Sequence, residues 1–152
     1  MSISVSISDQ QDALEIDRRR LRDIVRRTLQ SEGIDSAAIS VALVDDPAMH
    51  VLNRRHLDHD YPTDVLSFLL AGGPGGGGSK RLEGEIIIST DTAIRQAREY
   101  EWEPQAELAL YLVHGLLHLC GYDDHRAKDR REMRRREADI LQFWGLSPHY
   151  DE

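Results

Sequence analysis

The chain has 152 residues, of which 40% are hydrophobic and 30% charged, and this is the composition of a folded globular domain. It excludes a disordered or collagen-like chain, and a single cysteine excludes a fold built on internal disulfides. The net charge of −8, from 19 basic and 27 acidic side chains, excludes a protein that binds nucleic acid with its whole surface. We therefore expect one domain over residues 1–152, in which any binding of nucleic acid is local.

The basic residues are strongly clustered. Thirteen of the nineteen lie in two short segments, 18–27 and 126–136. One interpretation is that these segments are solvated helix faces, as such helices usually are. Their arginines would then pair with nearby acidic residues, which are Asp17, Asp23, Asp129, Glu132 and Glu137. The other interpretation is that the segments form local positive surfaces, and the arginine-rich segment 18–27 is then the best candidate.

Nothing in the sequence indicates a membrane or an export signal. The first residues lack the basic start of a signal peptide. The longest apolar run, residues 108–120, contains two histidines and falls short of the roughly 20 residues that a membrane span needs. We expect a cytoplasmic protein without a membrane partner.

The first 62 residues contain two strand patterns and two helix patterns. Apolar residues at every second position of 3–7 predict a strand. Helical spacing over 14–29, closed by Gly33, predicts an amphipathic helix, and 39–44 predicts a second strand. Asp45, Asp46 and Pro47 then begin a helix, which Pro62 ends at the latest.

The second half begins with two β-rich runs, 65–70 and 85–89, separated by a glycine-rich segment over 71–79. Lys80 follows a serine and no helix pattern follows it, so a phosphate-binding P-loop is disfavoured and a mobile linker is favoured. Three helices are then predicted, over about 91–102, 103–120 and 127–144, and Asp91 and Thr92 can cap the first of them.

The order of these elements predicts the fold class. Strands dominate the first half and helices the second, with little regular βαβ alternation, which favours an α+β fold. We expect a small mixed four-stranded sheet packed with about five helices. The helix over 103–120 has too many apolar positions for one stripe, so it should be the buried centre of the domain.

That central helix carries a histidine pair. His114 and His118 are four residues apart, so they lie on one face and can reach a single metal ion. His125 follows after Gly121, where the chain can turn back and bring a third imidazole close. Three histidines with one open position are typical of a catalytic zinc site.

Two core histidines satisfied by ordinary hydrogen bonds are the alternative. Burial favours the metal, because four ring nitrogens inside an aliphatic helix all need partners, and unpaired buried polar groups cost about 1–3 kcal/mol each. His114 is followed by Gly115, so the glutamate of HExxH metalloproteases is missing and a peptidase is disfavoured.

The segment from His114 to His125, HGLLHLCGYDDH, resembles the HGxLHLxGYDH signature of the YbeY family of bacterial metal-dependent endoribonucleases. Two further segments match in the same order. Leu52-Asn53 with the segment PTDVLSF over 62–68 resembles the family's LN…PTDVLSF, and Gly84-Glu85-Ile86 resembles its GDI. Together the matches span most of residues 40–126.

The resemblance implies a function. It implies a single-strand-specific endoribonuclease with one Zn²⁺ per chain, which matures the 3′ end of 16S rRNA and acts in late ribosome quality control. The implied partners are the 16S rRNA precursor and small-subunit components, with no DNA. The rival interpretation is a non-catalytic ribosome-assembly factor whose metal is structural.

The resemblance also implies roles for individual residues. His114, His118 and His125 carry over as metal ligands. Thr63 and Asp64, with Ser67, carry over as residues beside the metal, where Asp64 orients a ligand or a neighbouring backbone. Strand capping and turn hydrogen bonds are the alternative for these three residues.

Three departures from the family pattern matter. The signature has one aspartate too many, so Asp124 or His125 is the third ligand, and we favour His125 because imidazole suits zinc. Leu57 stands where the family has an arginine, so Arg54 and Arg55 are the expected substrate-binding residues. Glu85 replaces an aspartate of the family pattern, which leaves the role of that carboxylate open.

Overall fold

The computed structural model describes residues 2–56, 65–72 and 81–149. Its elements, in chain order, are β1 (Ser2–Gln10), α1 (Arg18–Ser31), β2 (Ser36–Val44), α2 (Asp46–His56), β3 (Val65–Ala71), β4 (Leu82–Ser89), α3 (Thr90–Glu99), α4 (Pro104–Leu119), α5 (Ala127–Leu141) and the short 3-10 helix η1 (Gln142–Trp144).

The four strands form one mixed sheet in the order β1-β2-β4-β3. β1 pairs with β2 and β2 with β4 in parallel, whereas β3 pairs with β4 in antiparallel register. The helix α1 connects β1 to β2, so the chain begins with a βαβ unit, which the element pattern did not predict. The mixed sheet and the five α-helices otherwise confirm the expected α+β class.

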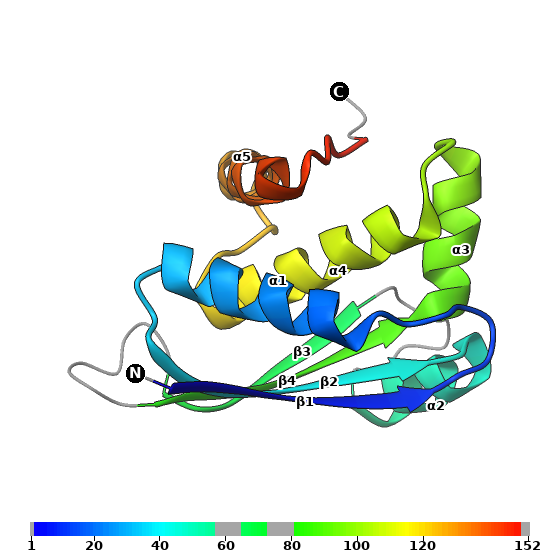
Figure 1. The fold of residues 1–152 in the computed structure, drawn as a ribbon, viewed down its shortest axis with the longest axis horizontal. Coiled ribbons are helices and arrows are strands. Elements are labelled where there is room, and N and C mark those ends of the chain that lie inside the picture. Colours follow the sequence, from blue (N-terminus) through cyan, green and yellow to red (C-terminus); the bar gives the residue numbers. More distant parts are fainter. Residues whose placement is uncertain (1, 57–64, 73–80, 150–152) are drawn as a thin grey trace.

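The two faces of the sheet are covered unequally (Figure 1). The helices α1 and α4 pack on one face and bury the larger core, to which β4 contributes Leu82, Ile86 and Ile88. The helix α2 lies on the other face over a smaller cluster that includes Met49 and Ile87. The helix α5 packs on α4 and lies farther from the sheet.

α4 is the buried centre of the domain, as expected. Twelve of its sixteen residues are buried. Two glycines let it lie close to the sheet: a Cβ at Gly115 would meet Ile86 Cγ2 at 3.1 Å, and a Cβ at Gly84 would meet Leu119 Cδ1 at 2.6 Å. This close contact fixes the position of His114, the neighbour of Gly115, relative to the sheet.

Some predicted boundaries shift. Asp91 and Thr92 were expected to cap the third helix, but the cap is Ser89, whose hydroxyl accepts a hydrogen bond from the amide of Thr92. That helix ends at Glu99, and the last helix continues as the 3-10 turn η1 up to Gly145. The glycine-rich segment lies outside the described residues apart from 71 and 72. Within the described ranges, no helix is both long enough and apolar enough to cross a bilayer.

Candidate metal centre

The histidine pair lies on one face of α4, as its spacing predicts. The Nε2 atoms of His114 and His118 are 3.1 Å apart, and the two rings are nearly perpendicular at a centroid distance of 4.6 Å. Both side chains are partly open to solvent, at 31% and 29%. The pair therefore faces an accessible space beside the core.

The second nitrogen of each ring is held by an acceptor. His114 Nδ1 lies 2.6 Å from Glu137 Oε2 of α5, and His118 Nδ1 lies 3.1 Å from the carbonyl oxygen of Tyr122. A carbonyl oxygen and a carboxylate oxygen accept hydrogen bonds, so each Nδ1 is assigned the proton and each Nε2 keeps its lone pair. The two lone pairs then point into the same space.

Asp124 completes the cluster. Its Oδ2 lies 3.6 Å from His114 Nε2 and 3.5 Å from His118 Nε2, and the three ligand atoms lie within 4.8 Å of one another. Two imidazole lone pairs and a carboxylate converge here with no donor hydrogen among them. A cation is the partner that satisfies all three, so the donor set fits a divalent metal ion.

The turn after α4 explains why Asp124 lies next to the pair. Gly121 adopts a positive φ of 104°, which reverses the chain as its position predicts. Asp123 Oδ1 then accepts hydrogen bonds from the amides of Asp124 at 2.7 Å and of His125 at 3.1 Å. The bond from His125, joined by that from Asp124, lowers the pKa of Asp123 below its ordinary value.

His125, the expected third ligand, lies apart from the pair in this structure. Its side chain is 87% exposed, and its Nε2 lies 3.6 Å from Asp123 Oδ1. It forms a second, more exposed group with Asp123 and Asp124, while Asp124 is the residue that faces the pair. Because the compact turn sends consecutive side chains to different sides, the extra aspartate takes the inner position.

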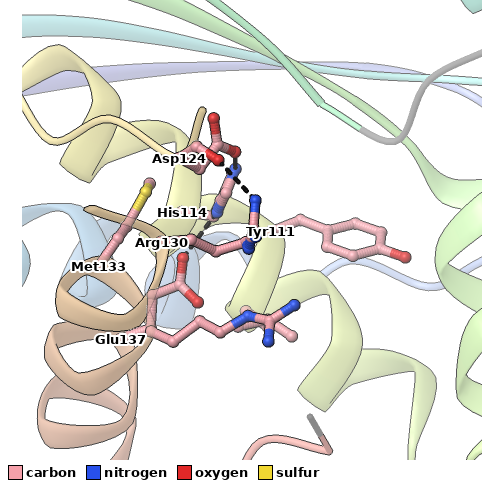
Figure 2. A pocket seen from close by; sticks show the side chains of 8 residues that line it. Tyr111, His114, Asp124, Arg130, Met133 and Glu137 are labelled. Atoms are coloured by element: carbon pink, nitrogen blue, oxygen red, sulfur yellow. Dashed lines mark hydrogen bonds and ion pairs between the residues drawn. The ribbon is translucent and has the colours of Figure 1, made fainter. Parts of the chain in front are cut away.

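An open pocket lies between α4 and α5 next to this cluster. α4 supplies Leu110, Tyr111 and His114, α5 supplies Arg130, Met133, Arg134 and Glu137, and the turn supplies Asp124. Figure 2 shows His114 between Asp124 and Glu137, with Arg130 alongside. His114 and Asp124 of the cluster are thus reached from a pocket that carries both acidic and basic groups.

Other expected site residues lie elsewhere. Arg54 is on α2, whose apolar side packs on the opposite face of the sheet, and it does not line this pocket. Ser67 lies in β3 opposite Ile86. Thr63, Asp64 and the side chain of Arg55 lie outside the described part of the chain. None of the pocket's basic residues comes from α1, the helix expected to form a positive wall.

Sequence reasoning missed Glu137, Arg130 and Arg134. Glu137 was interpreted as a partner for neighbouring arginines, yet its side chain is only 3% exposed and it holds His114. One signal was available: Met133, Glu137 and Ile140 follow helical spacing, so a glutamate occupies the buried stripe of α5. A buried carboxylate needs a partner, and His114 is that partner.

The sequence matches a known family over most of its length. The family model described as "Endoribonuclease YbeY" matches residues 6–145. A protein of Salinibacter ruber named "Endoribonuclease YbeY" is 37% identical over 140 residues, which cover 90% of this chain and 89% of that protein. One of Anaeromyxobacter sp. with the same name is 46% identical over 128 residues, which cover 84% of this chain and 65% of that protein.

The fold matches as well. The solution structure of TM1509 from Thermotoga maritima aligns with a TM-score of 0.59 at 23% identity, covering 94% of this chain and 91% of that one. The family model spans the segments that carry the histidine pair, the turn and α5. The resemblance drawn from the three motifs is confirmed, and the chain belongs to the endoribonuclease YbeY family.

Proposed function

We propose that this protein is a metal-dependent, single-strand-specific endoribonuclease that acts in rRNA processing. The observation that carries the proposal is the convergence of His114 Nε2, His118 Nε2 and Asp124 Oδ2 at an open pocket that His114 and Asp124 line. Relatives named "Endoribonuclease YbeY" over most of their length support RNA as the substrate. The proposed process is maturation of the 16S rRNA 3′ end and late ribosome quality control, in the cytoplasm.

We propose one Zn²⁺ per chain, held by His114, His118 and Asp124. Two imidazoles and a carboxylate with a side open to the pocket are a ligand set that zinc accepts in catalytic sites. Such an ion supplies Lewis acidity toward a phosphoryl group. His125 is the alternative third ligand, since it lies next to Asp124 in sequence and in the second cluster.

The protein's own residues would position these ligands. Glu137 fixes the ring orientation and the protonated nitrogen of His114, and the carbonyl of Tyr122 does the same for His118. The bonds from Asp123 to the turn amides hold Asp124 toward the pair. We propose that Thr63 and Asp64 also orient groups beside the metal, and that Arg54 and Arg55 bind the RNA substrate.

The proposed partners are the 16S rRNA precursor and components of the small ribosomal subunit. Single-stranded RNA is the proposed substrate, as the family resemblance implies, and the net charge of −8 confines its binding to a local part of the surface. DNA and membranes are not proposed as partners.

The first experiment measures metal content. Wild type, Asp124→Ala and His125→Ala are purified together, offered zinc, freed of excess and analysed by mass spectrometry. We expect about one zinc per wild-type chain, loss with Asp124→Ala and retention with His125→Ala. Retention with Asp124→Ala and loss with His125→Ala would move the third ligand to His125.

The second experiment measures cleavage of single-stranded RNA. We expect the wild type to cleave with zinc, and His114→Ala protein that keeps its circular dichroism spectrum to be inactive. Cleavage that persists in that folded variant would point to a contaminating nuclease. The rival assembly factor with a structural metal would then stand.

A further inference from the structure

Two arginines of α5 line the pocket beside the metal cluster. Arg130 and Arg134 are one helical turn apart, so they lie on the same side of α5, and both belong to the wall that contains His114. We propose that this arginine pair binds backbone phosphates of the RNA strand next to the bond that is cut. The inference rests on the proposed function and names the substrate contacts of the same site.

The position of Arg130 is fixed by the turn. Its NH1 donates a hydrogen bond of 3.2 Å to the carbonyl oxygen of Asp124, the residue whose carboxylate faces the histidine pair. A guanidinium has five N–H donors in a planar fork, so this single bond leaves donors for a second acceptor. Figure 2 shows Arg130 alongside Asp124 and His114.

Charge in the pocket supports the same role. Asp124 and Glu137 contribute two carboxylates to its wall, and an RNA strand adds one negative charge per phosphate. Among the described residues of this wall, Arg130 and Arg134 carry the lysine or arginine side chains. They therefore supply the positive charge that lets a polyanion approach the acidic cluster, and guanidinium is the side chain best matched to a phosphate.

Other arginines of α5 lie outside the pocket, and two of them can serve as controls. Arg136 is bound to Glu32 and to the carbonyl of Ser31 on α1, so it is already used in packing. Arg131 and Arg135 are exposed, follow Arg130 and Arg134 by one residue, and do not line the pocket. They carry the same charge on the same helix about 100° away around its axis, which makes them matched controls.

The experiment measures RNA binding separately from cleavage. Zinc-loaded protein is titrated into a fluorescent single-stranded 2′-O-methyl RNA oligonucleotide, which is checked for integrity after each run, and anisotropy gives Kd across a range of salt concentrations. We compare wild type, Arg134→Gln, the double variant Arg130→Gln/Arg134→Gln and the control Arg131→Gln/Arg135→Gln.

We expect the pocket double variant to weaken binding at least about tenfold and the control by less than about twofold. The slope of log Kd against log salt should fall by about 0.7 for each phosphate that the protein no longer neutralises, so by about 1.4 in the pocket double variant. Equal weakening in the two double variants would overturn the proposal, because it would show a general effect of charge. Unchanged binding in the pocket variant would overturn it too.

Metal content shows whether Arg130 and Arg134 bind RNA or only hold Asp124 in position. If Arg130→Gln/Arg134→Gln loses its zinc along with RNA binding, the pair holds Asp124 in place and the phosphate proposal fails. Retained zinc with weakened binding supports it, and Arg134→Lys should then recover part of the affinity.

The nuclease function and the phosphate site can be refuted separately. If the wild type binds RNA through the arginine pair but never cleaves it, the proposed nuclease function fails and the phosphate site stands. If the wild type cleaves RNA and all variants bind it equally well, the nuclease function stands and the phosphate site fails.

Discussion

Two glutamate–histidine pairs in this molecule have the same local chemistry and different surroundings. Glu137 binds His114 at 2.6 Å, and Glu107 binds His149 at 2.5 Å. Both glutamates are almost fully buried, at 3% and 1% exposure. In each pair the carboxylate holds one ring nitrogen, so what distinguishes them is the environment of the other nitrogen.

For His114 the other nitrogen faces His118 and Asp124 at the edge of an open pocket. For His149 the ring stacks on Tyr100 at a centroid distance of 3.9 Å and meets the edge of Trp102 at 5.0 Å. Its Nδ1 is buried and has no hydrogen-bond partner among the described residues. The first pair orients a proposed metal ligand, whereas the second fastens the C-terminal segment to α4.

The largest expected effect is the difference between His114 and His149 in metal binding and RNA cleavage. We expect His114→Ala to abolish metal binding and to lower RNA cleavage by at least about a hundredfold, since it removes a ligand of the proposed metal. His149→Ala should keep both properties at the level of folded protein. Metal analysis and a cleavage assay on both variants test this, and equal losses would show that the two pairs are not distinct in function.

The glutamates sharpen the same contrast. Glu137→Gln keeps the shape of the side chain but removes the charge that fixes the protonated nitrogen of His114, and such changes typically cost about 10–100-fold in metal affinity or activity. The matched change Glu107→Gln should leave the zinc dissociation constant unchanged. Competition with a chelator measures both, and a normal affinity in Glu137→Gln would mean that Glu137 only packs.

The pair of Glu107 and His149 should contribute to stability instead of metal binding. His149→Ala leaves the carboxylate of Glu107 buried without its imidazole, so the free energy of unfolding should fall by about 1–3 kcal/mol. His125→Ala, whose side chain is 87% exposed, should change it by less than about 0.5 kcal/mol. Urea unfolding measures both values. The same midpoint for His149→Ala and wild type would contradict a fastening role.

Asp46 is a carboxylate outside both glutamate–histidine pairs, and its charge should affect stability through pH. Burial would raise the pKa of Asp46, but hydrogen bonds from Ser89, Arg95 and Thr92 outweigh it and lower the pKa below its ordinary value. The folded-state pKa is then below that of the unfolded chain, so this carboxylate stabilises the fold above about pH 4 and loses that effect as pH falls further.

We therefore expect Asp46→Asn to lower the free energy of unfolding at pH 7 by about 1 kcal/mol, with a difference from wild type that shrinks below about pH 4. Urea unfolding at several pH values measures this. A difference that stays constant down to pH 3 would mean that the charge of Asp46 contributes nothing.

Much of the fold follows from patterns in the sequence. The serine-alternating strand, the amphipathic α1 and the apolar α4 were all predicted by periodicity, because burial repeats every two residues in a strand and every three to four in a helix. The βαβ unit was missed, because the pairing of β1 with β2 rests on contacts between distant segments, which local patterns do not specify.

The candidate site, too, could be predicted only in part from the sequence. The spacing of His114 and His118 determines that they share a face of α4, and the glycine at 121 determines a turn, since both are local properties of the backbone. Neither could determine whether Asp124 or His125 faces the pair. The choice depended on the shape of the turn, in which the amides of Asp124 and His125 both donate hydrogen bonds to Asp123. These bonds leave the side chain of Asp124 facing the pair.

By itself, the sequence determined the family, the α+β class and the helix that carries the histidine pair, since these depend on periodicity and on ordered motifs. Only the tertiary structure decided that Glu137 holds His114, that Arg130 and Arg134 line the pocket and that Asp124 is the third side chain of the cluster. Those contacts join α4 to the turn and to α5. Their geometry exists only once the helices are packed, because side chains more than a turn apart in sequence meet through the fold and not through the local backbone.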